Sequence, residues 1–197
     1  DPSDAIDATR RNISVLFADI RNFSTYCENH PPEESTAVLH AFFSAITRIV
    51  EQHGGLVEYF QGDAVLAVWG SGSDGPTPQK ALAAAHAIYI QSLSLFPQPK
   101  PDELSPLALG IGLEMGEATV GSFGLARRRT HLAIGHPVTA AMRLQEMTAE
   151  LAHPILVGEG LSAGLGNHQL VSQGMFLLEG LKNPCHIYAY PLSDCVE

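Results

Sequence analysis

An almost unbroken apolar run that ends in a single carboxylate constrains this chain more than any other feature. Residues 13–18 (ISVLFA) include one polar side chain, Ser14, and Asp19 follows them directly. A run with so little alternation is typical of a strand that is covered on both faces of a sheet. An ionised carboxylate at its end is costly unless something positive meets it, whereas an Asp that caps a turn is common. Asp19 is therefore either a turn residue or part of a site that binds a cation.

A second carboxylate favours the cation site. Residues 54–70 (GGLVEYFQGDAVLAVWG) are typical of a strand, a very short turn at Gln61 and Gly62, and a return strand, which places Asp63 at a hairpin tip. If this hairpin pairs with the first strand, Asp19 and Asp63 lie at one edge of the sheet. Magnesium prefers one or two carboxylates together with phosphate oxygens. The pattern predicts a magnesium site that works with a phosphate-bearing substrate.

Composition limits the class of protein and its partners. The chain has 197 residues, 45% of them hydrophobic, and we predict a single domain over residues 1–197 with a polar connector at residues 1–11. A formal net charge of −10 argues against DNA, RNA or an anionic membrane as the main partner. The 3 cysteines form no close pair, which favours a reduced, cytoplasmic compartment.

The start of the chain suggests that more protein precedes it. The first residue is Asp1 rather than Met, so we expect a piece of a longer protein that carries regulatory domains. No apolar run approaches the ~20 residues of a membrane span. A membrane anchor elsewhere in the full-length protein stays an open alternative.

Helix and strand patterns alternate along the rest of the chain. Pro31 and Pro32, followed by two glutamates, predict a helix start, and the apolar spacing carries this helix to about His53. The other predicted elements are helices at 79–93 and 137–150, a helical turn near 161, and strands at 107–115, 118–123, near 132, at 154–157 and around 170, 176 and 187. This order predicts an α+β sandwich whose sheet is covered on one side by helices.

Four segments together resemble the catalytic domain of the class III adenylate and guanylate cyclases. They are VLFADIRNFS at 15–24, GDAVLAVWG at 62–70, LGIGLEMGEATVGSFG at 109–124, which is similar to the central hairpin of that family, and IGHPVTAAMRL at 134–144. The resemblance implies a ferredoxin-like βαββαβ core with additional hairpins. It also implies an enzyme that converts a nucleoside triphosphate, ATP by default, to the 3′,5′-cyclic monophosphate and pyrophosphate.

The resemblance implies a two-metal site at the paired carboxylates. Two Mg²⁺ (or Mn²⁺) ions would be held by Asp19, Asp63 and the carbonyl of Ile20, and the ribose 3′ oxygen would attack the α-phosphate. Such ions lower the pKa of the attacking hydroxyl and neutralise phosphate charge, so no protein base is required. Gly62 and the loop that follows Asp19 are expected to bind the phosphates through backbone N–H groups. The loop residues are Asn22, Phe23 and Ser24.

The second catalytic segment implies two further site residues. Arg143 falls where the family has an arginine that stabilises the transition state, a task that suits a guanidinium because its fork matches phosphate oxygens. Thr139 falls where the family has an Asn that orients the ribose. Glu179 replaces a triphosphate-binding Lys of many relatives, and Lys182, three residues on, is a candidate substitute.

The two positions that select the base in this family depart from its pattern. They are Tyr59 and Leu132, neither of which can read adenine through a charge. GTP or a pyrimidine nucleotide therefore stays open as the substrate. A cyclase-like regulatory module that binds nucleotide with little or no turnover is the alternative from another functional class.

The resemblance also implies assembly. The family site lies at the interface of a head-to-tail homodimer, which would take Asp19 and Asp63 from one subunit and Arg143 from the other. The segment 118–123 is expected to reach across the two-fold axis.

Overall fold

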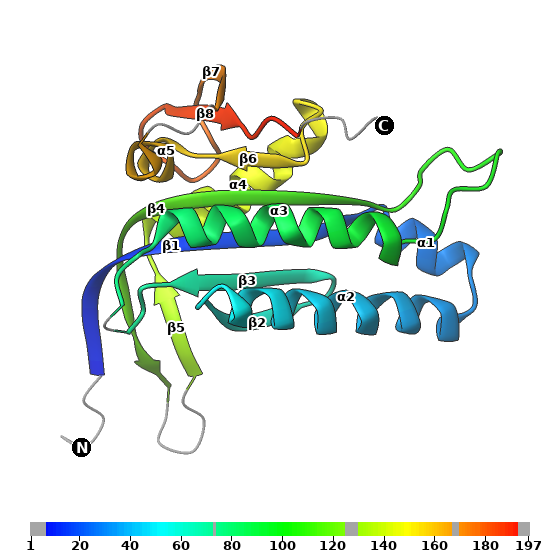
Figure 1. The fold of residues 1–197 in the computed structure, drawn as a ribbon, viewed down its shortest axis with the longest axis horizontal. Helices are drawn as coiled ribbons and strands as arrows, with labels where there is room; N and C mark the ends of the chain where they lie inside the picture. The colour runs from blue at the N-terminus through cyan, green and yellow to red at the C-terminus, as the bar shows by residue number, and fades with distance from the viewer. Residues whose placement is uncertain (1–6, 73, 125–129, 167–169, 193–197) are drawn as a thin grey trace.

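A computed structural model describes residues 7–72, 74–124, 130–166 and 170–192, and its centre is one mixed sheet (Figure 1). Seven strands follow the order β2-β3-β1-β4-β6-β8-β7, and β5 pairs with β4 beside this path. All pairs are antiparallel except β4 with β6. The strands are β1 (Asp7–Arg21), β2 (Leu56–Gln61), β3 (Ala64–Trp69), β4 (Ala108–Phe123), β5 (Thr130–Ile134), β6 (Ile155–Val157), β7 (Val171–Phe176) and β8 (Cys185–Ala189).

The two longest strands, β1 and β4, lie side by side over almost their whole length. Their register runs from Asp7 opposite Ser122 to Arg21 opposite Ala108. The connector predicted at residues 1–11 is therefore wrong from residue 7 onward, because residues 7–11 are paired with β4; residues 1–6 lie outside the described part. On its other edge β1 pairs with β3, which confirms that the hairpin 54–70 joins the first strand.

β4 is one continuous strand, so the predicted break between residues 115 and 118 is wrong. Gly116 and Glu117, the residues expected to turn, are paired with Ile13 and Asn12 of β1. The partner strand supplies regular hydrogen bonds there, and a glycine does not prevent a paired strand from continuing. Similarly, the strands expected around 170 and 176 are a single strand, β7, with a bulge between Ser172 and Gly174.

Helices cover both faces of the sheet, so the prediction that they cover one side is wrong, because α4 packs on the face opposite α2 and α3. They are α1 (Phe23–Asn29), α2 (Pro32–Gln52), α3 (Pro78–Leu95), α4 (His136–Glu150) and α5 (Glu159–Leu165). α2 and α3 pack on one face and α4 packs on the other (Figure 1). None of the helices in the described ranges is both long and apolar enough to cross a membrane.

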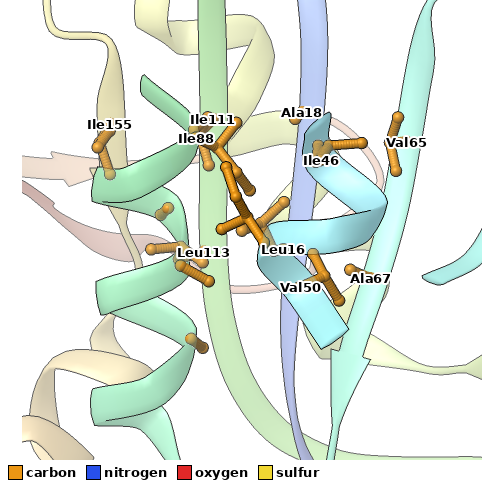
Figure 2. Close-up of a cluster of buried hydrophobic side chains, with 14 of the residues drawn as sticks. Leu16, Ala18, Ile46, Val50, Val65, Ala67, Ile88, Ile111, Leu113 and Ile155 are labelled. Atoms are coloured by element: carbon orange, nitrogen blue, oxygen red, sulfur yellow. The ribbon is translucent and has the colours of Figure 1, made fainter. Parts of the chain in front are cut away.

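The alternate residues of β1 explain why both faces are apolar. Leu16 and Ala18 join the cluster under α2 and α3 (Figure 2), where Ile46 comes from α2 and Ile88 from α3. The odd-numbered residues of the same run belong to the cluster on the α4 face. The prediction of a strand covered on both faces is confirmed.

α4 rests directly on the backbone of β4. A Cβ atom at Gly112 would overlap the carbonyl oxygen of Ala141, and one at Gly110 would overlap Oγ1 of Thr148. Glycine at these positions therefore permits the close approach, since any side chain would push the helix away from the strand. This contact fixes α4 relative to the strands that carry the site.

Candidate active site

Asp19 lies inside the sheet rather than at the start of a loop. It pairs with Ala64 of β3 and Gly110 of β4, and β1 continues to Arg21. Its Oδ1 is buried and has no hydrogen-bond partner among the described residues. The pKa of its carboxyl is raised from an ordinary 3.8 to about 7, chiefly by burial and then by the hydrogen bond with Asp63 and the negative charge of that residue.

Asp63 brings the second carboxylate to the same place. It lies in the turn between β2 and β3, where Gly62 adopts φ 59°, a left-handed conformation that glycine adopts without strain. Asp63 is within hydrogen-bond reach of Asp19, which requires a proton between two groups that otherwise repel each other. The predicted proximity of the two carboxylates is therefore present in the structure, at the edge of the sheet where β1 ends and β3 begins.

The residues at this edge fit a divalent cation. A cation would replace the shared proton and would meet the buried Oδ1 of Asp19, which has no other partner. No group of three or more His, Cys, Asp or Glu side chains in the described part of the chain could hold a metal. Two carboxylates leave coordination positions for phosphate oxygens and water, the arrangement that magnesium prefers. The amide of Ile20 donates to the Asp19 carboxylate, and the carbonyl of Ile20 stays a candidate ligand.

The predicted phosphate loop is the start of a helix. Asn22 is the N-cap of α1 with φ 66°, its side chain donates to the carbonyl of Pro106 at 2.8 Å, and Phe23 and Ser24 form the first turn. The prediction of a loop is wrong because residue 22 turns the chain directly from β1 into α1. The first N–H groups of a helix have no partner within it, so backbone donors are still present here.

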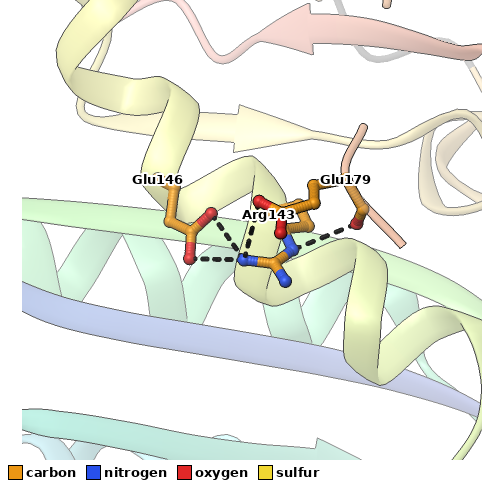
Figure 3. Close-up of polar contacts among 3 residues, drawn as sticks. All are labelled: Arg143, Glu146 and Glu179. Carbon is orange, nitrogen blue, oxygen red and sulfur yellow. Dashed lines mark hydrogen bonds and ion pairs between the residues drawn. The ribbon is translucent and has the colours of Figure 1, made fainter. Parts of the chain in front are cut away.

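Arg143 lies on α4 between the side chains of Glu146 and Glu179. Its Nη1 donates to both oxygens of Glu146 at 2.9 and 3.0 Å, and its Nε donates to the carbonyl of Glu179 at 3.1 Å (Figure 3). The hydrogen bonds and charge of Glu146 raise the pKa of Arg143. Within the described residues no hydrogen bond or ion pair joins Arg143 to Asp19 or to Asp63.

Thr139 lies one turn before Arg143 and lines a cavity of about 640 Å³. Lys182 and Gly180 line the same cavity from the segment between β7 and β8. The structure thus brings the candidate substitute lysine near the predicted ribose position. Glu179, the residue before Gly180, contacts Arg143.

Tyr59 and Leu132 lie on two strands that contact each other, β2 and β5. Tyr59 is half-buried against the cluster on the α4 face, and burial, followed by the charge of Glu58, raises its pKa. Leu132 is also half-buried and lies opposite Gly121 of β4. The two strands contact each other without pairing, since β3, β1 and β4 lie between them in the strand order.

Glu58 and Glu146 are the charged residues near these positions that the sequence reasoning missed. Glu146 stands three residues after Arg143 on a helix, a spacing that brings side chains together and was visible in the sequence. Glu58 was not recognisable, because its orientation depends on an irregularity in the pairing of β2 with β3.

Comparisons with known proteins support the family resemblance that the four sequence segments indicated. Residues 7–189 match the family model described as the adenylate and guanylate cyclase catalytic domain. Adenylate cyclase 1 of Rhizobium meliloti is 29% identical over 157 residues, 79% of this chain and 24% of that protein. The uncharacterized protein Rv1318c of Mycobacterium tuberculosis is 34% identical over 138 residues, 70% of this chain and 24% of that protein. The chain thus spans about a quarter of the length of these relatives.

Solved structures share the fold. The adenylyl cyclase CyaB from P. aeruginosa superposes with a TM-score of 0.81 at 24% identity, covering 95% of this chain and 97% of the other. The guanylyl cyclase Cya2 gives 0.71 at 26% identity, covering 92% of each chain.

Proposed function

Because this chain belongs to the adenylate and guanylate cyclase catalytic domain family and is a class III nucleotidyl cyclase domain, we propose that it converts a nucleoside triphosphate, ATP by default, to the 3′,5′-cyclic monophosphate and pyrophosphate. The pairing of Asp19 with Asp63 at one sheet edge carries the proposal. Both side chains offer carboxylate oxygens as metal ligands. The buried Oδ1 of Asp19 has no hydrogen-bond partner among the described residues.

The paired carboxylates are proposed to bind two Mg²⁺ or Mn²⁺ ions together with the Ile20 carbonyl. When bound, such ions activate the ribose 3′ hydroxyl and neutralise the triphosphate. Asp19 and Asp63, near the end of β1, would hold the two ions, and the backbone N–H groups of Asn22, Phe23, Ser24 and Gly62 are proposed to orient the phosphates beside them. The rigid strands on either side of Asp19 keep this geometry fixed.

Arg143 and Thr139 are proposed to act across a homodimer interface. Arg143 would stabilise negative charge that develops on the α-phosphate, because a guanidinium keeps its charge and binds oxygens with two N–H groups. Thr139 would hydrogen-bond the ribose. Within one chain Arg143 bonds to glutamates instead of approaching the metal carboxylates, and this supports a site that is completed by a second copy.

Which nucleobase the substrate carries is also part of the proposal. ATP is the default, and the structural neighbours include both adenylyl and guanylyl cyclases, all of them distant, so GTP or a pyrimidine nucleotide is the alternative. Tyr59 and Leu132 would line the base pocket. We also propose that this domain is part of a longer protein that supplies regulatory domains, and that it works in the cytoplasm, where nucleoside triphosphates are available.

One observation favours a module that binds nucleotide with little turnover. Two glutamates, Glu146 and Glu179, occupy the guanidinium of Arg143, and a substrate phosphate has to displace them. In this second candidate the carboxylate pair still binds metal and nucleotide, but no cyclic product forms.

Product identification separates these candidates. The domain is incubated with each of the four nucleoside triphosphates and Mn²⁺. The products are separated by chromatography and identified by mass spectrometry. We expect a cyclic monophosphate from at least one triphosphate, and a loss of roughly a hundredfold or more in Asp63→Asn. Asp102→Asn, an exposed aspartate on a loop, is the matched control and should retain full activity. Binding of nucleotide without any cyclic product would refute the cyclase and favour the module.

A further inference from the structure

A cavity of about 490 Å³ lies apart from the residues proposed for chemistry. It is lined by the last residue of β1, the start of β4, the last two turns of α3 with the segment that follows them, and the loop after α4. These parts of the chain meet at one end of the sheet (Figure 1). Neither Asp19 nor Asp63 lines the cavity, and Thr139, Arg143 and Lys182 do not line it either. A ligand bound there would therefore not occupy the proposed active site.

Arg21, the last residue of β1, is the one charged residue among the described residues that line this cavity. Its Nη2 donates to the carbonyl of Leu109 at 3.3 Å, a long hydrogen bond to a neutral acceptor. Its Nε is buried and has no hydrogen-bond partner in the described part of the chain. Its Nη1 also forms no hydrogen bond with a described residue, but it is not among the enclosed atoms. Donors of the guanidinium are thus left for a ligand.

No carboxylate offsets the charge of this guanidinium. The ion pairs between described residues do not include Arg21, although Asp19 lies two positions earlier on the same strand. No Asp or Glu is among the described residues that line the cavity, in a chain whose formal net charge is −10. A partly buried charge without a counter-ion has lost hydration that the protein does not replace. An anion that enters the cavity would supply the missing partner.

The rest of the cavity wall is mainly apolar. Leu93 of α3, Phe96 and Leu107 line it together with three prolines. The hydroxyl of Ser92, one of the few polar groups in the wall, already donates to the carbonyl of Tyr89 at 2.6 Å. The cavity therefore offers one cation for an acidic group and an apolar surface for the remainder of a ligand.

We infer that this cavity binds a monocarboxylate with an apolar body, and that the carboxylate pairs with Arg21. One arginine matches one negative charge, and its planar fork suits the two oxygens of a carboxylate. A phosphate ester or a nucleotide carries more charge and more polar surface than this wall can satisfy. The inference goes beyond the proposed function and does not depend on it, because the ligand is not the substrate of the carboxylate pair.

Binding measurements with three small probes test the chemistry of the ligand. Octanoate carries both the charge and the apolar chain, octanamide keeps the chain without the charge, and acetate keeps the charge without the chain. Ligand-observed NMR titrations should show one octanoate per chain, bound at least roughly tenfold more tightly than either of the other two. Equal affinity for octanamide would remove the charge from the inference, and equal affinity for acetate would remove the apolar body. Either result, or no binding of octanoate, would overturn it.

Arg21→Gln tests the residue. This variant removes the charge and keeps a polar side chain, so affinity for octanoate should fall at least roughly tenfold, whereas affinity for octanamide should stay the same. Arg10→Gln is the matched control, because Arg10 lies near the other end of β1 with a side chain that is 80% exposed. It should bind octanoate like the unmodified chain. An unchanged affinity for octanoate in folded Arg21→Gln, or an equal loss for octanoate and octanamide, would overturn the inference.

A second variant keeps the inference testable if Arg21→Gln fails to fold. Leu93 lines the cavity but is 55% exposed, so Leu93→Glu should fold, and its carboxylate should repel octanoate and compete for Arg21. We expect octanoate binding to weaken at least roughly tenfold. Ile90→Glu adds the same charge at a half-exposed position of α3 that does not line the cavity, and it should cost at most about twofold. Equal effects of the two glutamates would contradict binding in this cavity.

Discussion

Replacing Asp19 with Asn should make the metal-free protein more stable at pH 8. In the folded protein the pKa of Asp19 is about 7, and in the unfolded chain it returns to about 3.8. The folded state therefore holds a proton that the unfolded state releases between about pH 4 and pH 7. Stability must fall as the pH rises through this window, because the folded state binds more protons, and it levels off above about pH 7. Asparagine carries no charge and removes this cost.

The size of the effect follows from the two pKa values. Their separation of about 3 corresponds to roughly 4 kcal/mol at pH 8. Asp19 is only partly buried, and solvent screening reduces this to about 2 kcal/mol. At pH 5 most of the penalty is absent, and roughly 0.7 kcal/mol remains. For a domain of this size, about 2 kcal/mol corresponds to a rise of roughly 4–8 °C in Tm.

Thermal unfolding in EDTA, followed by circular dichroism at pH 5 and pH 8, measures this difference. Glu114, whose pKa is also raised to about 7 by burial, contributes the same slope to both proteins and cancels in the comparison. Asp102→Asn serves as the control for removing an exposed carboxylate. A stability difference between the unmodified chain and Asp19→Asn that fails to increase from pH 5 to pH 8 would refute the reasoning.

Three further predictions concern metal, assembly and packing. Magnesium at pH 8 should raise the Tm of the unmodified chain but not that of Asp63→Ala, as differential scanning fluorimetry would detect; an equal rise in both would remove Asp63 from the site. Asp19→Ala and Arg143→Ala should each be inactive, and mixing them should restore activity in heterodimers; no recovery, with heterodimers shown by native mass spectrometry, would place both residues in one subunit. Gly112→Ala should cost about 2–4 kcal/mol because its Cβ overlaps a backbone carbonyl of α4, whereas Gly72→Ala, with open space around it, should unfold in urea like the unmodified chain.

Local patterns predicted the elements whose cause is local. The apolar run before Asp19, the hairpin that carries Asp63 and the proline start of α2 were all visible in the sequence, because turn residues and periodicity act over a few positions. The proximity of the two carboxylates followed from the pairing of that hairpin with β1. It was the longest-range prediction about the site that the structure matches.

Pairing between distant segments explains what the sequence did not reveal. The strand β4 continues through Gly116 because β1 lies beside it, and the residues near Gly116 in the sequence do not indicate that pairing. Likewise, Glu179 meets Arg143 from 36 positions away. Glu58 turns inward because of a bulge, which only the register with β3 defines.

The contact between α4 and β4 has a mechanical consequence. Since the glycines let the helix rest on bare backbone, Arg143 and Asp19 belong to one stiff body, and their separation within a chain cannot be adjusted by bending. In a site shared by two copies, the distance that matters is set by how one body is rotated against the other. A sensor domain attached to such a chain would then control turnover by rotating one copy against the other by a few degrees at their interface. The shape of each copy would stay the same.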